Sequence, residues 1–106
     1  MIFDYEVIPD IQRQVAEWHK SVWPECTNEQ LIEKAKDEFQ EWLDDPSDIT
    51  EIADVILVLM AYAGRNRDDD NPLKTDIQCA MSVKFDRNRK LTRAEWDARD
   101  AARGIH

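Results

Sequence analysis

The sequence predicts an all-α protein, on three observations. Apolar residues recur at helical spacing in several segments, whereas no segment alternates apolar and polar residues as a half-buried strand does. Only 2 glycines and 4 prolines occur among 106 residues, too few for a protein built on β-turns. The length suits one domain with a modest core, so we expect residues 1–106 to form a single all-α domain.

Two helices are predicted in the first half of the chain. Apolar residues at helical spacing predict a first helix from residue 9 or 10 to residue 23, and Pro24 stops it. The capping box Thr27-x-x-Gln30 begins a second helix, which runs to about Leu43.

Three more helices are predicted in the second half. After the short connection DDPSD, a third helix begins at residue 47 or 48 and ends at Gly64, antiparallel to the second. Beyond the polar loop RNRDDDN, a fourth helix runs from about residue 72 to residue 90. The capping box Thr92-x-x-Glu95 then opens a short polar C-terminal helix. We expect a four-helix core with the hairpin of the second and third helices at its centre.

The third helix is apolar nearly all round, because its side chains between Ile52 and Tyr62 cover every direction of the helical wheel. Three neighbouring helices can hardly cover such a surface. A symmetry-related copy is the simplest cover, so we expect a homo-oligomer.

Charge and hydropathy argue against several classes of protein. The net charge of −9 is unsuited to a general nucleic-acid binder, which needs a basic face. The apolar run 55–63 is far shorter than the roughly 20 residues that span a bilayer. With no signal-peptide pattern at the start, we expect a cytoplasmic protein without a membrane or nucleic-acid partner. Residues 84–103 carry seven Lys or Arg against four acids, so a polyanionic small molecule could bind if cations bridge it to the acidic remainder.

The cysteines and histidines match no metal motif. Cys26 and Cys79 stand apart and fit neither metal nor redox spacing, which predicts two free thiols. His19 and His106 belong to no HExxH motif or Cys/His cluster, so a zinc site is not expected.

Four carboxylates form the pattern that points to chemistry. Glu38 and Glu41 are three residues apart on the second helix, and Glu51 and Asp54 are three apart on the third, so each pair shares a helix face. In an antiparallel hairpin, residues equally far from the turn lie beside each other. Glu41 should therefore face Glu51, and Glu38 should face Asp54, which gives one compact cluster.

Such a cluster needs protons or cations to relieve its repulsion. A set of oxygen ligands without His or Cys favours Mg²⁺, with Mn²⁺ as a substitute, and the Glu-x-x-His pairs of a di-iron bundle are absent. Mg²⁺ held by carboxylates usually keeps positions open for water and substrate phosphates. The pattern therefore favours phosphoryl chemistry.

Three polar side chains fit a phosphate chain lying on this cluster. Lys34 lies one turn before Glu38, whereas Lys84 and Asn88 fall on the inward face of the fourth helix. An inward Lys or Asn is costly unless it reaches a partner, and a phosphate chain would be such a partner.

Each feature alone also has a plain structural explanation. Glu38 and Glu41 suit a solvated face, and Glu51 suits the N3 position of a capping box with Asp48 as the cap. Asp54 suits the dipole of a first turn, and Lys84 could reach solvent from the edge of a core. The mirrored register of the two acid pairs, with Lys and Asn nearby, is what favours a site.

The aromatic residues are open to two interpretations. Trp18, Trp23 and Trp42 are expected in the core rather than stacked on a base. Trp18, His19 and Trp23 nevertheless precede the hairpin, which makes them the candidates for base contacts. Nothing in the spacing decides which base would bind.

The segments LIEKAKDEFQEW and DITEIADVILVLMAYA resemble the E-x-x-E and E-x-x-D signature of the all-α NTP pyrophosphatases, the MazG-like superfamily, over about Asn28 to Trp96. The order K-x3-E-x2-E, a DPSD-type turn, E-x-A-D, K-x3-N and R-x2-W is similar to the phage-type dATP/dGTP pyrophosphohydrolase (MazZ-like) branch. The chain departs from the family at Asp37, where Glu is frequent.

The resemblance implies a reaction and a set of residues. The reaction cleaves a nucleoside triphosphate between its α- and β-phosphates, giving a monophosphate and pyrophosphate, with Glu38 or Glu41 aligning or deprotonating water. The implied Mg²⁺ ligands are Glu38, Glu41, Glu51 and Asp54, and the implied triphosphate contacts are Lys34, Lys84 and Asn88. Dimers or tetramers, and purine deoxynucleotide substrates, are also implied.

Two alternatives stay open. One is a dUTP or dCTP pyrophosphatase that uses the same metal site. The other is a non-catalytic helical module that senses nucleotides or dimerises with a partner.

Overall fold

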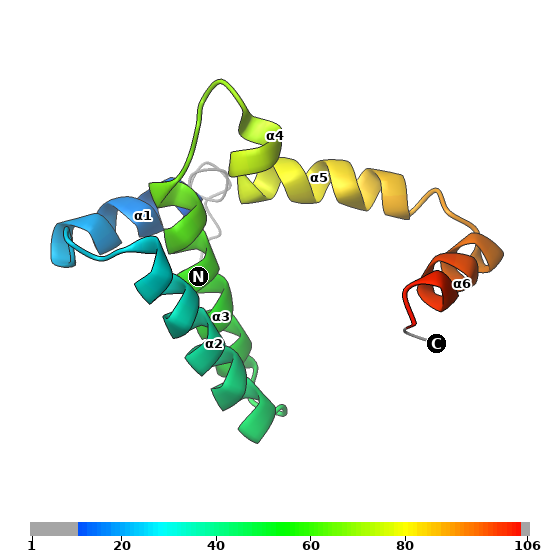
Figure 1. Cartoon of the computed structure of the whole chain (residues 1–106), viewed down its shortest axis with the longest axis horizontal. Helices are drawn as coiled ribbons and strands as arrows, with labels where there is room; N and C mark the ends of the chain where they lie inside the picture. The colour runs from blue at the N-terminus through cyan, green and yellow to red at the C-terminus, as the bar shows by residue number, and fades with distance from the viewer. Residues whose placement is uncertain (1–10, 105–106) are drawn as a thin grey trace, which may run out of the picture.

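The computed structural model describes residues 11–104, which form six helices and no strand (Figure 1). The prediction of an all-α protein is therefore confirmed for this range. The predicted start of the first helix at residue 9 or 10, and His106, lie outside the described residues. The helices are α1 (Ile11–Val22), α2 (Asn28–Asp44), α3 (Ile49–Arg65), α4 (Pro72–Thr75), α5 (Ile77–Asn88) and α6 (Arg93–Ala102).

Local capping groups set the starts of the helices. Thr27 Oγ1 accepts a hydrogen bond from Gln30 N at 3.2 Å, and Gln30 Oε1 accepts one from Thr27 N at 2.9 Å. The same reciprocal pair joins Thr92 and Glu95 at the start of α6. Both predicted capping boxes are thus confirmed, and each satisfies backbone N–H groups that the first helical turn leaves unpaired.

Helices α1, α2 and α3 form the packed part of the molecule. α2 and α3 lie side by side as a hairpin, and α1 packs across α3 (Figure 1). Gly64 permits this crossing, because a Cβ there would clash with Ala16 Cβ and lie 2.7 Å from Gln12 O. The predicted role of Gly64 as the end of the helix is wrong, since α3 continues to Arg65 and its C-cap is Asn66. The glycine is required by close packing instead.

The predicted fourth helix is broken in two. Between α4 and α5, Asp76 is extended, with φ −108° and ψ 116°, and its side chain caps α5. The side chain of Gln12, from α1, spans the break by donating to Thr75 O at 2.9 Å and accepting from Ile77 N at 2.6 Å. The prediction of one continuous helix over residues 72–90 is therefore wrong, because a polar side chain from a distant helix takes up the backbone groups at the break.

Three helices rather than four pack together within the described chain. α5 packs mainly on α4 and leads away from the hairpin to α6 (Figure 1). The radius of gyration is 16.3 Å, against about 13 Å for a compact domain of this length. Only Ala16, Leu31 and Ala61 are buried apolar residues in the described part.

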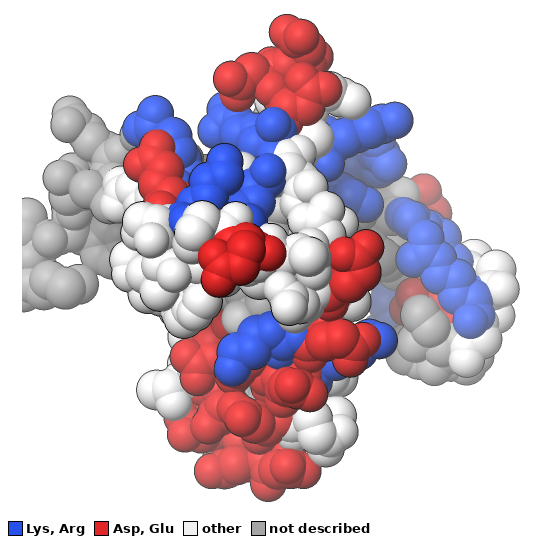
Figure 2. Space-filling view, turned by 60° about the vertical axis from the view of Figure 1, so that its left-hand side comes forward, with Lys and Arg blue, Asp and Glu red and all other residues white. Residues whose placement is uncertain are grey.

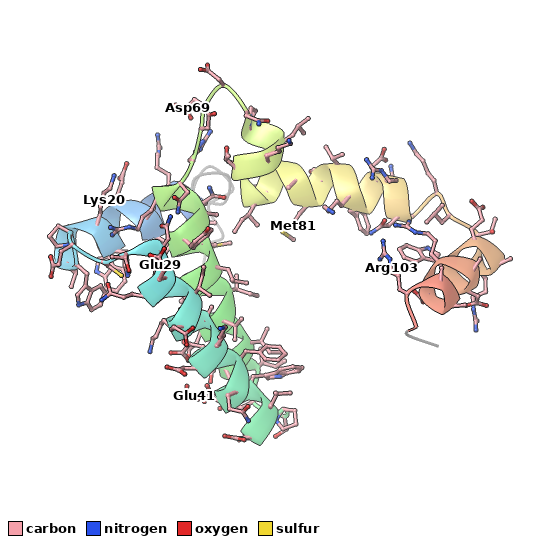
Figure 3. The ribbon with its side chains drawn as sticks, viewed as in Figure 1. Lys20, Glu29, Glu41, Asp69, Met81 and Arg103 are labelled. Carbon is pink, nitrogen blue, oxygen red and sulfur yellow. The ribbon has the colours of Figure 1, made fainter. Side chains whose placement is uncertain are left out.

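Exposed apolar side chains follow from this arrangement. Ile56 and Leu59 on α3 are 45% and 46% exposed, so the apolar surplus predicted for the third helix is present. On α5, Met81 and Phe85 are 63% and 68% exposed, and Met81 lies on a side of α5 where no other helix is drawn (Figure 3). None of the helices between residues 11 and 104 combines the length and the apolar character that crossing a bilayer requires.

The predictions for the tryptophans are partly wrong, whereas the prediction for the cysteines is confirmed. Trp18 is 58% and Trp23 45% exposed, so their predicted place in the core is wrong, whereas Trp42 is half-buried. Cys26 and Cys79 are free thiols, as predicted, and both are half-buried.

Candidate functional site

The hairpin brings three carboxylates together, which we call the acidic triad: Glu38 and Glu41 on α2, and Glu51 on α3. Each offers one oxygen, and these oxygens lie within 4.8 Å of one another. Glu38 is buried, Glu51 is half-buried, and Glu41, which Figure 3 labels, is exposed. Oxygens around a single divalent cation are at most about 4–5 Å apart, so the triad has the size of a metal site.

Two oxygens of the acidic triad are buried without a partner. Lys34 Nζ contacts Glu38 Oε1 at 2.7 Å. Glu38 Oε2 and Glu51 Oε2 are buried and have no hydrogen-bond partner among the described residues. Asp48 caps α3 by accepting from Thr50 N at 2.9 Å. Glu51 does not complete a capping box with it, because Asp48 N donates to Asp45 O at 3.1 Å instead. Buried carboxylate oxygens without donors are costly, and a cation would satisfy both.

The pKa values of the triad diverge because the carboxylates are crowded. A hydrogen bond from Lys34 holds the pKa of Glu38 below its usual value. A hydrogen bond with Glu38 and repulsion from its charge raise the pKa of Glu41, since two carboxylates can bond only when one is protonated. Burial and nearby acids raise the pKa of Glu51. Glu41 and Glu51 therefore hold protons more tightly than free glutamates do, and a cation would compete with those protons.

The triad lies in the most acidic part of the chain. Residues 37–54 contain eight Asp or Glu and no Lys or Arg. Figure 2 shows these acidic side chains gathered over the lower end of the molecule, where the hairpin turns. Such a field concentrates cations at the triad.

Asp54, the fourth predicted metal ligand, lies outside the triad. Its side chain is exposed, and its charge raises the pKa of Glu51, one turn before it on α3. It also borders the cavity that Glu38 borders. The hairpin therefore brings three of the four predicted ligands within 4.8 Å and leaves the fourth beside them.

The predicted phosphate contacts do not come together in one chain. Lys34 contacts the triad through Glu38. Lys84 is exposed on α5, and the backbone carbonyl of Asn88 accepts a hydrogen bond from Trp96 Nε1 at 3.2 Å. Because α5 leads away from the hairpin (Figure 1), Lys84 and Asn88 lie apart from the triad within the chain.

A cavity of about 700 Å³ opens beside the triad, within the range of about 300–1,000 Å³ usual for small-molecule sites. The charged residues that line the cavity on the side of the triad are Lys34, Glu38 and Asp54. Its apolar lining comes from all three packed helices: Val15, Leu31, Leu57, Val58 and Ala61. No pattern in the sequence indicates this cavity, because it depends on how α1 crosses the hairpin.

Trp18, His19 and Trp23 form an aromatic wall of the cavity. The ring centroids of Trp18 and Trp23 are 5.5 Å apart with planes at 89°, and the His19 ring is 5.0 Å from that of Trp23. The wall thus consists of the three residues that the sequence indicated as candidates for base contacts, and an aromatic ring there could stack with a planar ligand.

Arg65, in the last turn of α3, fastens this wall. Its guanidinium donates to Trp23 O at 3.1 Å and to Cys26 O at 2.9 Å, and it faces His19 Nδ1 at 3.1 Å. Sequence reasoning missed Arg65, because a basic residue near a helix C-terminus is ordinary dipole complementation.

The described chain is thus all-α, and it carries a carboxylate cluster of the size of a metal site beside a cavity large enough for a small-molecule ligand. Comparison of the chain with protein-family models, with curated proteins and with solved structures finds no match. The function of the chain is therefore inferred from the triad and the cavity themselves.

Proposed function

We propose that this protein is a metal-dependent nucleoside triphosphate pyrophosphohydrolase, converting a (d)NTP and water to a (d)NMP and pyrophosphate, with the purine deoxynucleotides dATP and dGTP as substrates. The observation that carries the proposal is the acidic triad, with two buried unpartnered oxygens, at the border of a ligand-sized cavity with an aromatic wall. A nucleotide has complementary parts, since its phosphates need cations and its base needs ring faces. The resemblance of residues 28–96 to the MazG-like superfamily points to the same reaction.

The ligand set favours Mg²⁺, with Mn²⁺ as a substitute, on Glu38, Glu41 and Glu51. Three carboxylates without His or Cys suit a hard cation. Asp54 is the proposed fourth ligand, because it lies one turn after Glu51 and borders the same cavity as Glu38. The bound ion would neutralise phosphate charge and lower the pKa of water.

The protein's own groups supply the remaining steps. Glu38 or Glu41 takes the proton of the water that attacks the α-phosphate, and pyrophosphate leaves. Lys34, which is 57% exposed at its side chain and contacts Glu38, has the freedom to turn toward a phosphate. One of the two indole rings stacks the base, since the planes of Trp18 and Trp23 are 89° apart and a planar base can lie parallel to only one of them. Such stacking is worth about 1–3 kcal/mol for one base on an aromatic side chain.

The complete site is proposed to form in a homo-oligomer, a dimer or a tetramer. Within one chain, α5 carries Lys84 and Asn88 away from the triad and leaves Met81 and Phe85 exposed. Packing of α5 on the hairpin of a second copy would bury these apolar side chains and restore a four-helix core. It would also bring the basic segment 84–103 toward the acidic segment 37–54.

The test of the reaction is to incubate the protein with each dNTP and NTP, in Mg²⁺ and in EDTA, and to resolve the products. Monophosphate and pyrophosphate from dATP or dGTP, only with metal, are expected. Preference for dUTP or dCTP would select the pyrimidine alternative, and nucleotide binding without turnover would select the non-catalytic module. Glu33→Gln is the matched control for Glu38→Gln, because Glu33 is an exposed glutamate of α2 that pairs with Lys36, away from the triad.

The test of the oligomer is sedimentation of the wild type and of Phe85→Asp. Phe85 is 68% exposed in the single chain, so the substitution costs the monomer little. A smaller species with lower activity is expected for the variant. A wild type that sediments as a monomer while fully active would exclude the shared site.

A further inference from the structure

The side chains of His19 and Arg65 are in hydrogen-bond contact. Arg65 NH1 lies 3.1 Å from His19 Nδ1. A guanidinium has only donors and keeps its charge in proteins, so Nδ1 must accept this hydrogen bond and carries no proton. The neutral imidazole then carries its proton on Nε2.

We propose that Arg65 fixes His19 as the neutral Nε2–H tautomer, and that His19 thereby becomes the hydrogen-bond donor that selects ligands with a ring acceptor at the aromatic wall of the cavity. His19 lines the cavity, and no described residue accepts a hydrogen bond from its Nε2. Among residues 11–104 the Nε2–H group is therefore without an acceptor, and it can donate to a ligand in the cavity. The ligand side of this inference rests on the proposed function, because purines offer ring nitrogens as acceptors.

Arg65 is well placed to act as a positioning residue. Besides His19, its guanidinium donates to three carbonyls of the connection after α1: Trp23 O at 3.1 Å, Pro24 O at 3.4 Å and Cys26 O at 2.9 Å. The planar guanidinium makes these bonds in fixed directions, so it orients the His19 ring better than the ammonium group of a lysine would. The same side chain thus holds the backbone that carries Trp23 and the ring of His19.

Charge around His19 favours the neutral ring. Burial and the charge of Arg65 lower the pKa of His19. Protonation would place two cations 3.1 Å apart and remove the acceptor that Arg65 uses. The other charged or titratable groups nearby are Glu17 and Lys20 on α1, Glu25 and Cys26 in the connection, Lys34 and Glu38 on α2, and Asp54 on α3.

The first experiment determines the tautomer in the ligand-free protein by long-range ¹H–¹⁵N NMR of the histidine rings. Signals of His106 are identified by their persistence in His19→Gln. The Nε2–H tautomer is expected for His19, with a titration midpoint below that of a free histidine. In Arg65→Met both tautomers should appear and the midpoint should rise, whereas Lys20→Gln, which also removes a neighbouring positive charge, should leave the tautomer unchanged. An Nδ1–H tautomer in the wild type would overturn the proposal without reference to any enzyme activity.

The second experiment measures binding of dAMP and its 1-, 3- and 7-deaza analogues by calorimetry. One analogue should bind about tenfold more weakly to the wild type, the loss of about 1.4 kcal/mol for one unsatisfied hydrogen bond. His19→Gln, which keeps a donor, should preserve the discrimination, and His19→Phe, which keeps a ring, should abolish it. Equal binding of all analogues to the wild type would refute His19 as the selecting donor. Failure of dAMP and dATP to bind at all would instead contradict the proposed function, while the NMR result would still decide the tautomer.

Discussion

Replacing Gly64 with alanine is expected to displace α1 from α3 and to weaken the aromatic wall that α1 carries. The new Cβ would clash with Ala16 Cβ and lie 2.7 Å from Gln12 O, where ordinary contacts are 3.4–4 Å. Because Gln12 O belongs to the backbone of α1, the helix itself must move. Overpacking of this kind costs about 1–3 kcal/mol, and alanine in place of glycine within a helix returns about 1 kcal/mol. With two contacts this close, we expect a net loss of about 1–2 kcal/mol.

Thermal unfolding followed by circular dichroism measures this loss. A change of 1 kcal/mol shifts Tm by about 4–8 °C in a domain of this size, so Gly64→Ala should unfold at least about 4 °C lower. Ala16→Gly removes one of the two clashes, so Gly64→Ala should lower Tm less in an Ala16→Gly protein than in the wild type. Binding of dAMP should weaken in the single variant, because Trp18 and His19 move with α1. A Gly64→Ala protein with a higher Tm would refute the close crossing of the two helices.

Three further perturbations test the site and the fold. Glu38→Gln and Asp54→Asn should each keep the helices formed and abolish turnover, and full activity in both would exclude the metal site. The fold raises the pKa of Glu41 above its ordinary value of 4.5. The free energy of unfolding of the metal-free protein therefore falls as pH rises from 4.5 through the raised pKa, because the folded state favours the protonated carboxyl. Wild type in EDTA should therefore lose stability relative to Glu41→Gln over that window, and Mg²⁺ should restore it; a pH-independent difference would contradict the crowding. Gln12→Ala should cost about 1–3 kcal/mol, because two backbone groups at the α4–α5 break lose their partner. Unchanged hydrogen exchange at the start of α5 would argue against that role.

The sequence predicted the features whose causes are local. The capping boxes at Thr27 and Thr92 each involve residues three apart, so they could be recognised without knowledge of the fold. The triad followed from mirrored spacing on two helices joined by a short connection, since that connection fixes which residues face each other. Asp54 fits the same register, but its side chain is one methylene shorter than a glutamate and its carboxylate stays outside the 4.8 Å group.

The features that the sequence did not predict depend on contacts between distant residues. The break before α5 requires Gln12, which is 65 residues before Ile77, and the pattern of residues 72–90 alone favours one helix. The state of His19 requires Arg65, 46 residues later in the chain. Trp18 and Trp23 have the apolar character of core residues, and only the crossing of α1 over the hairpin places them on a cavity instead.

The two hydrogen bonds that Gln12 makes across the α4–α5 break connect the position of α1 to that of α5. Gln12 and Trp18 belong to the same helix and are six residues apart, about 9 Å along its axis. A helix of this length behaves as a stiff rod, so a tilt at the cavity end of α1 is carried to the end that holds the break. A ligand that tilts α1 at the cavity would therefore also displace Gln12 and the backbone groups of Thr75 and Ile77 that it binds, at the start of α5.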